Sequence, residues 1–414
     1  MHLWTAETVS QLGSQVSLLA IPLVAINVLH ATTFEVGALT AVEMSPFVIF
    51  GLLAGVAVDR LPRRPVLVWS DVGRAAALIT IPVAHYFGWL TLGQLLAVVF
   101  VTGTLTVFFD VAYMSYLPAL VERDQLADGN AKLEISRSAA QIAGPGLGGL
   151  LVQLVGAATA VVTDALSFVV SALSIRGICA KEAELVKTPD DVTGVRRVGR
   201  EVREGLTYVF HHRYLRSIAA STATSNFFSS MIQAVFLLYA VRELNYSAGV
   251  VGLVYVLGNL GTLITAPASA RITRAVGLGR TIWGSMFICG VGGLLLGIAP
   301  RSNAFGWFVV AWLLFSAFST LYNIGQVSFR QAITPHRLQG RMNASMRFMV
   351  WGTMPFGSLA GGILGTAIGL RPTLLVAGIG GMAAFLWLYF SPVRTLKEIP
   401  APVDELPVPL PVEQ

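Results

Sequence analysis

Three carboxyl groups lie inside long apolar stretches of this sequence, where an acidic side chain could bind and release protons. Glu43 lies in the middle of one stretch, Asp164 lies within another, and Glu7 lies near the start of the first. An ionisable residue inside a membrane is costly and is therefore a functional candidate. Removal from water favours the protonated form of a carboxyl group. We therefore expect Glu43 either to carry protons or contact substrate, or to be a hydrogen-bonded structural acid, with Asp164 and Glu7 as further candidates.

Two opposite charges, Asp71 and Arg74, are three residues apart on one predicted helix. Side chains at this spacing share a helix face, so we expect an ion pair at the inner mouth of the protein. Two cysteines, Cys179 and Cys289, cannot form a disulfide framework or a zinc cluster, and the histidines fall at the ends of the apolar stretches. No metal and no cofactor are expected. Because no lysine follows a glycine and no HExxH or GxSxG pattern occurs, we expect neither an ATPase nor another enzyme.

The composition determines what surrounds these charges. Of the 414 residues, 55% are hydrophobic and only 12% are charged, with a mean hydropathy of +0.70. A soluble domain carries about 25% charged residues, so the chain has too little polar surface for soluble domains. A helix needs roughly 20 apolar residues to cross a bilayer. The sequence predicts an all-α membrane protein with twelve spans, at 3–28, 34–58, 65–87, 92–117, 135–156, 158–178, 215–240, 247–270, 280–299, 304–328, 342–367 and 372–391.

The basic residues set the expected orientation. Of the 28 lysines and arginines, only Arg242, Arg301 and Arg371 fall on one side of the predicted spans. Basic residues concentrate on the cytoplasmic side of membrane proteins. We therefore expect both termini in the cytoplasm of a bacterium, and a multi-pass protein of its inner membrane. The net charge of +6 is then a topology signal, and a nucleic-acid partner is not expected.

The two halves of the chain share a pattern. Five positions recur at one common offset close to half the chain length, namely Asn130, Ala131, Gly144, Gly148 and Gly149, which match Asn343, Ala344, Gly357, Gly361 and Gly362. This spacing indicates a six-plus-six repeat. We expect an N-terminal six-helix half at 1–178, a cytoplasmic loop at 179–214, a C-terminal half at 215–393 and a disordered tail at 394–414. The second half of the loop is predicted to form an amphipathic helix. The loop as a whole is expected to be a solvated linker, and the alternative is a regulatory domain.

A basic turn follows the second predicted span. Gly51 and Gly55 form a small-xxx-small pair that lets two helices approach closely. Asp59 ends the span, and the arginines that follow can pair with it or with acids on neighbouring helices; these are Arg60, Arg63 and Arg64. The alternative is a plain positive-inside turn beside a packing glycine pair.

The fifth predicted span contains a GPxxGG pattern, formed by Gly144, Pro145, Gly148 and Gly149. Proline removes a backbone hydrogen bond and kinks a helix, while the glycines permit close packing. The pattern is therefore typical of a helix that moves. The alternative is that glycine and proline are simply frequent in membrane helices.

These motifs resemble those of the major facilitator superfamily. The string 51–64 is similar to its signature loop between helices two and three, with Pro62 where glycine is usual, and GPxxGG is similar to the motif of its proton-coupled exporters. The segments 109–113, 117–121 and 204–206 resemble the branch that holds macrolide-efflux and enterobactin-exporter-type proteins. Members of this branch usually carry a short basic segment before the first span. The given sequence starts almost inside that span, which is compatible with a native start upstream of Met1.

The resemblance implies a monomeric secondary transporter that exchanges protons for a small amphipathic or hydrophobic compound by alternating access. It implies that the Asp59–Arg64 loop holds the cytoplasmic side shut in the outward-facing state. It also implies that Asp110 is an ionic partner of this loop rather than a proton carrier. The alternatives are a proton-coupled importer and, from another class, a membrane sensor or enzyme that transports nothing.

Overall fold

In a computed structural model, the described residues are 2–59, 61–120, 126–178 and 194–398, and they form helices and connecting turns without a strand. The first half contains α1 (His2–Leu23), η1 (Val24–Val28), α2 (Thr33–Asp59), α3 (Arg63–Tyr86), α4 (Leu92–Leu120), α5 (Leu126–Val155) and α6 (Ala157–Arg176). After α7 (Gly194–His211) come α8 (Arg213–Leu238), η3 (Tyr239–Glu243), α9 (Ala248–Val276), α10 (Leu278–Ile298), η4 (Arg301–Asn303), α11 (Ala304–Ala332), α12 (His336–Trp351), α13 (Met354–Ile368), α14 (Leu370–Ala383), α15 (Leu386–Tyr389) and η5 (Pro392–Thr395).

Within the described ranges, eleven helical segments are long and apolar enough to cross a membrane, which confirms the multi-pass helical class. The expected span at 342–367 differs, because it is not continuous. It consists of α12 and α13, of 16 and 15 residues, with a break at Gly352 and Thr353. The break has a local cause, since Pro355 lacks the N–H that a continuous helix would need. Neither piece alone reaches the roughly 20 residues that a span requires.

The repeat that the glycine spacing predicted is also visible in the backbone. The first helix of each half ends in a π-helical turn, η1 or η3. Each turn is followed by a residue with a left-handed backbone, His30 with φ 52° and Asn245 with φ 55°, and these are the non-glycine residues with positive φ in the described part. The two halves therefore share a detail of geometry that no simple sequence match would show.

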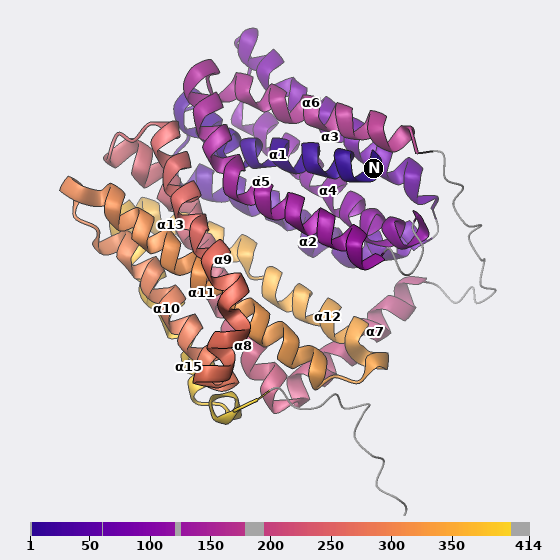
Figure 1. Ribbon diagram of the computed structural model, residues 1–414. Coiled ribbons are helices and arrows are strands. Elements are labelled where there is room, and N and C mark those ends of the chain that lie inside the picture. Colours follow the sequence, from indigo (N-terminus) through magenta and orange to yellow (C-terminus); the bar gives the residue numbers. More distant parts are fainter. Residues whose placement is uncertain (1, 60, 121–125, 179–193, 399–414) are drawn as a thin grey trace, which may run out of the picture.

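The halves meet at one end of the molecule and separate at the other. We name the end where α2 finishes and α3 and α12 begin the basic end, and the other the opposite end. In Figure 1, α1–α6 (indigo to magenta) and α8–α15 (pink through orange to yellow) form two groups, and α7 lies where they diverge. At the opposite end one apolar cluster combines residues of both halves, such as Leu23, Phe236 and Leu238. At the basic end each half has its own cluster, around Tyr116 or around Phe329.

The described parts of the segment between the halves and of the chain end contact the C-terminal half. The predicted amphipathic helix is α7, whose Glu204 accepts a hydrogen bond of 2.6 Å from Arg341 of α12. Residues 179–193 and 399–414 lie outside the described part. The expected disordered tail at 394–414 differs in its described part, because the carbonyls of Leu396 and Lys397 accept hydrogen bonds from the first turn of α10.

Candidate functional site

A chamber of about 370 Å³ lies between the two halves, and Glu43 lines it. Helices α1, α2 and α5 contribute from the first half, and α8, α9 and α11 from the second. We call this space the central chamber. Its lining residues are Gln15, Leu18, Leu19, Pro22, Val36, Thr40, Glu43, Met44, Ser138, Gln141, Ile142, Pro145, Gln233, Leu237, Tyr255, Asn259, Thr262 and Trp312.

Glu43 is the charged residue of this lining. It is half-buried, and the described residues offer its carboxylate no hydrogen bond or ion pair. The wall across the chamber is aromatic and amide-rich. Tyr255 and Trp312 stack edge to face at 4.9 Å, and Asn259 donates a hydrogen bond of 2.9 Å to the carbonyl of Gln141. The chamber can accept an apolar group of a ligand. Its own charge can change through one carboxyl group, that of Glu43.

The helix-five motif lies beside this chamber, and its glycines face two neighbours. A Cβ built on Gly144 would overlap the side chain of Gln15, and one built on Gly148 would lie 3.1 Å from the Cα of Val16, so these glycines face α1. A Cβ on Gly149 would lie 2.5 Å from the carbonyl oxygen of Ala248, so this glycine faces α9 of the other half. Glycine is required here because neither neighbour leaves room for a side chain.

The second half repeats this contact. Gly361 faces α8 of its own half, since a Cβ built on it would lie 2.9 Å from the carbonyl oxygen of Met231. Gly362 faces across to α2, where its Cβ would lie 3.2 Å from the Cα of Gly37. Both glycine pairs therefore close the opposite end in the same way. We call the contacts of Gly149 with α9 and of Gly362 with α2 the glycine crossings.

The remaining predicted acids lie away from the central chamber. Asp71 and Arg74 form an ion pair, but both are buried inside the first half rather than at its mouth. The Arg74 guanidinium lies between the rings of Phe109 and Phe168, at 4.3 and 4.1 Å from their centroids. The pair therefore holds α3 against α4 and α6.

Glu7 and Asp164 are buried in helix contacts as well. Gln11 donates a hydrogen bond of 2.7 Å to Glu7 within α1. Asp164 of α6 accepts one of 3.2 Å from Ser167, and it lies against Gly13 of α1, on which a Cβ would be 2.7 Å from the carboxylate. Neither acid lines the cavities found in the described part.

The basic turn is only partly described. Asp59 is the last residue of α2, but its side chain and the whole of Arg60 lie outside the described part. Arg63 and Arg64 begin α3, and Arg64 donates to the carbonyl of Arg176. The close helix approach expected at Gly51 and Gly55 is absent in this conformation, since no described atom lies within 4 Å of a Cβ built on either. The reason is that the halves are separated at the basic end.

Asp110 faces the other half across this separation. It lines a cavity of about 250 Å³ between α2, α4 and α12, together with Gly51 and with Arg347 of the second half. The resemblance linked Asp110 to the basic turn. The structure adds Arg347 as a charge on the facing helix.

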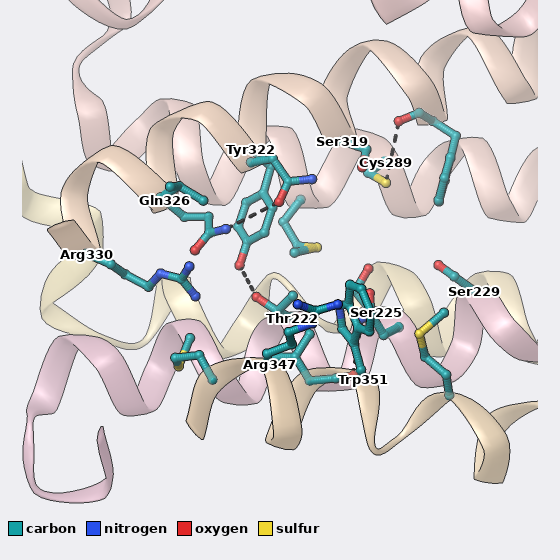
Figure 2. Close-up of a pocket in the computed structure, with 18 of the residues that line it drawn as sticks. Thr222, Ser225, Ser229, Cys289, Ser319, Tyr322, Gln326, Arg330, Arg347 and Trp351 are labelled. Atoms are coloured by element: carbon teal, nitrogen blue, oxygen red, sulfur yellow. Dashed lines mark hydrogen bonds between the residues drawn. The ribbon is translucent and has the colours of Figure 1, made fainter. Parts of the chain in front are cut away.

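A third space was not predicted from the sequence. It has a volume of about 460 Å³ and lies among α8, α10, α11, α12 and α13, and we call it the polar chamber. Figure 2 shows Tyr322, Gln326 and Arg330 of α11 turned towards it, with Arg347 and Trp351 on the facing side. Arg347 falls inside the predicted span 342–367, so a charged residue within an apolar span was the available signal.

The three spaces adjoin one another. Gln233 lines both the central and the polar chamber, while Asn343, Arg347 and Trp351 line both the polar chamber and the smaller cavity. Cavities that share lining residues thus extend from Asp110 at the basic end to Glu43. Two pseudo-symmetric helical halves that enclose such a series of cavities, and that pack against each other at the opposite end only, define a transporter of the major facilitator fold.

The comparisons agree with this class. The chain matches the model of the "Transmembrane secretion effector" family over residues 1–413, and it belongs to that family. It is 26% identical to the multidrug efflux pump Tap of Mycolicibacterium fortuitum, over 82% of this chain and 84% of that protein. It is 22% identical to macrolide efflux protein A of Streptococcus pyogenes, over 88% of this chain and 91% of the relative.

Solved structures support the fold alone. A bacterial homologue of the iron transporter ferroportin, in an inward-facing state, superposes with a TM-score of 0.74 at 17% identity, covering 94% of this chain and 97% of that chain. A POT family transporter in complex with a thioalcohol-conjugated peptide gives 0.73 at 9% identity, covering 94% of each chain.

Proposed function

We propose that this protein is a proton-coupled exporter of small amphipathic or hydrophobic compounds, in a bacterial inner membrane with the basic end facing the cytoplasm. The observation that carries the proposal is the position of Glu43. It is the one charged side chain among the described residues that line the chamber between the halves. A carboxyl group there can be reached by substrate and by protons alike.

The direction of transport is supported by the relatives and by the shape. The relatives are named as efflux pumps for several drugs or for macrolides. The molecule is closed by the glycine crossings at the opposite end, and its chambers adjoin the basic end. With the basic end in the cytoplasm, this is the state that loads cargo from inside the cell.

Coupling follows if proton binding to Glu43 and substrate binding favour different conformations of the protein. A ligand that binds two states equally shifts no equilibrium. The groups facing Glu43 from the other elements are uncharged, among them Gln15 of α1, Gln233 of α8 and Tyr255 of α9. Protonation of Glu43 therefore removes the one charge among the described lining residues. This change can shift the equilibrium between the conformation open at the basic end and the conformation open at the opposite end.

We assign the conformational change to the two halves, 1–178 and 215–393, rocking about the central chamber. When the glycine crossings open, the basic end must close. Gly51 and Gly55 would then gain the close helix contact that they lack here, and the turn from Asp59 to Arg64 would approach the facing half. Asp110 and Arg347, which already face each other, would approach further.

The experiment is transport by the full chain in sealed vesicles. A fluorescent amphipathic drug should be pumped against its gradient when a proton gradient is imposed, and a protonophore should abolish the movement. Drug movement that ignores the proton gradient would overturn the coupling. Proton-driven movement in the same direction as the protons would instead support the importer, and an absence of flux for every compound would support the sensor.

A further inference from the structure

The polar chamber carries an unbalanced positive charge. Its charged lining residues are Arg330 and Arg347, and no aspartate or glutamate lines it among the described residues. The rest of the lining is rich in groups that form hydrogen bonds, including Asn226, Asn343 and Tyr322. A desolvated guanidinium is costly unless an anion is paired with it. The chamber therefore has the chemistry of a site that binds a negatively charged group.

Arg330 is the centre of this imbalance. It is half-buried in the last turn of α11, it forms no ion pair with any described residue, and its Nε is buried without a hydrogen-bond partner there. A cation near the end of a helix is favoured by the helix dipole. That effect accounts for a positive charge at this position, but it does not account for a guanidinium turned into a cavity.

A second buried group beside Arg330 is also unsatisfied. Gln326 is 4% exposed, and its Oε1 has no partner among the described residues, while its Nε2 donates to Asn323 at 3.3 Å. Figure 2 shows the Gln326 amide and the Arg330 guanidinium turned towards the same space as the Tyr322 hydroxyl. Tyr322 and Thr222 share a hydrogen bond of 2.5 Å that links α11 to α8. These groups together form a preformed polar pocket.

Arg347 is partly balanced and adds the second positive charge. Its guanidinium lies 4.2 Å from the ring centroid of Trp351, which fixes its direction. It faces Asp110 in the adjoining cavity, and Asp110 does not line the polar chamber. A ligand that reaches the polar chamber therefore meets Arg330 uncompensated and Arg347 at its edge.

We infer that the polar chamber binds the negatively charged group, a carboxylate or a phosphate, of an amphipathic substrate, with Arg330 as its principal contact and Arg347 as the second. This inference rests on the proposed exporter function and names its substrate class. The apolar part of such a molecule would extend past Gln233 towards Tyr255 and Trp312, which line the central chamber. Outward movement of an anion is also favoured by a membrane potential that is negative inside.

The test compares probes of one shape and different charge on the purified full chain in a neutral detergent. The probes are naphthalene-2-carboxylate, 2-naphthyl phosphate, naphthalene-2-carboxamide and naphthalen-2-ylmethylammonium, and binding is read from thermal stabilisation against concentration. A hydrogen bond to a charged partner should make the two anions bind about tenfold more tightly than the amide. Equal affinity for the anions, the amide and the cation would overturn the inference.

Two variants and a control locate the site. Arg330→Gln should lower the affinity for the carboxylate to that of the amide, and Arg330→Lys should retain part of it. Arg271→Gln removes the same charge from an exposed position at the basic end and should change nothing. An Arg330→Gln variant that is folded and binds the carboxylate unchanged would overturn the assignment. If that variant does not fold, the probe series on the unmodified chain still decides.

A lipid headgroup could supply the same phosphate chemistry, so one arm adds dioctanoyl phosphatidylglycerol as a competitor. The substrate assignment requires the naphthalene anions to bind without lipid. If only the phospholipid binds, the substrate assignment is wrong. Anion binding is measured without transport. An absence of proton-driven drug movement in vesicles would therefore overturn the proposed exporter function without overturning the anion site in the polar chamber.

Discussion

Gly149 of α5 and Gly252 of α9 lie so close that a Cβ built on Gly149 would be 3.2 Å from the Cα of Gly252. The same separation occurs between a Cβ on Gly362 and the Cα of Gly37, on the other side of the molecule. Two helices of opposite halves can approach this closely only where both lack side chains. The opposite end is therefore closed by a contact that a single methyl group would disturb.

The first prediction concerns this closure. Gly149→Val should disfavour the present conformation, because overpacking costs about 1–3 kcal/mol, enough to change the ratio of two states about 5- to 150-fold. A cysteine introduced at Thr40, in the central chamber, should then react faster with an impermeant thiol reagent from the opposite side. Gly284→Val is the control, since nothing described lies within 4 Å of a Cβ there. Unchanged labelling with Gly149→Val would contradict the role of the crossing.

The second prediction separates Glu43 from Asp164. Glu43→Gln mimics the protonated form permanently, so uphill efflux should be lost while downhill exchange of substrate continues. Asp164→Asn weakens a buried contact between α1 and α6. It should lower thermal stability, and both activities should fall together. The measurement is the pH dependence of efflux and of exchange in vesicles. If Glu43→Gln still pumps uphill with an unchanged pH profile, Glu43 does not carry the proton.

The third prediction concerns the basic turn, and it rests on the sequence motif. Asp59→Asn should abolish most transport while the protein remains folded and inserted, because it removes a charge partner at an interface that moves. The matched control is Glu134→Gln, at an exposed position on α5. Near-normal export by Asp59→Asn would leave the turn as a topology signal only.

The fourth prediction concerns the buried ion pair of the first half. Removing one partner of a buried pair costs about 3–5 kcal/mol, so Arg74→Met should lower the unfolding temperature strongly. Arg74→Met combined with Asp71→Asn should destabilise less than the sum of the two changes, since no buried charge of this pair then remains. Thermal unfolding in detergent gives the comparison. Purely additive effects would show that the two side chains do not stabilise each other.

The fifth prediction tests the orientation. A cysteine replacing Arg271, exposed at the basic end, should react with an impermeant thiol reagent only from the cytoplasm, and one replacing Ser302, exposed at the opposite end, only from outside. The native Cys179, in the basic loop, should behave like the first. The reverse pattern in intact cells would invert the proposed topology and with it the direction of loading.

The class of protein could be predicted because it depends on composition and on local spacing. Long apolar stretches must become helices in a bilayer, where each backbone group needs a partner within its own segment. The offset between the glycine pairs predicted the repeat, and the glycines of the GPxxGG pattern predicted close packing of the fifth span. The broken span at Gly352 was missed, because a hydropathy pattern does not show how one proline interrupts an otherwise apolar run.

The functional site was only partly predictable. A charge inside an apolar run marks Glu43, Asp164 and Glu7, with Glu43 as the most central of them, but it does not show which face of a helix the side chain occupies. The structure places Glu43 in the central chamber and the other two in helix contacts. Arg330 was counted with the basic residues that set topology, since it ends a helix where such residues are expected.

By itself the sequence determined a multi-pass helical protein of two related halves, together with its basic end and the glycine motif of its fifth span, because these follow from composition and spacing along the chain. Only the tertiary structure decided that Gly149 meets Gly252, that Glu43 faces Tyr255 and Trp312, and that Arg330 and Gln326 share a pocket. The reason is physical. Each of these relations joins faces of different helices, and the rotation of a helix in the bundle is set by how its side chains pack against all its neighbours at once.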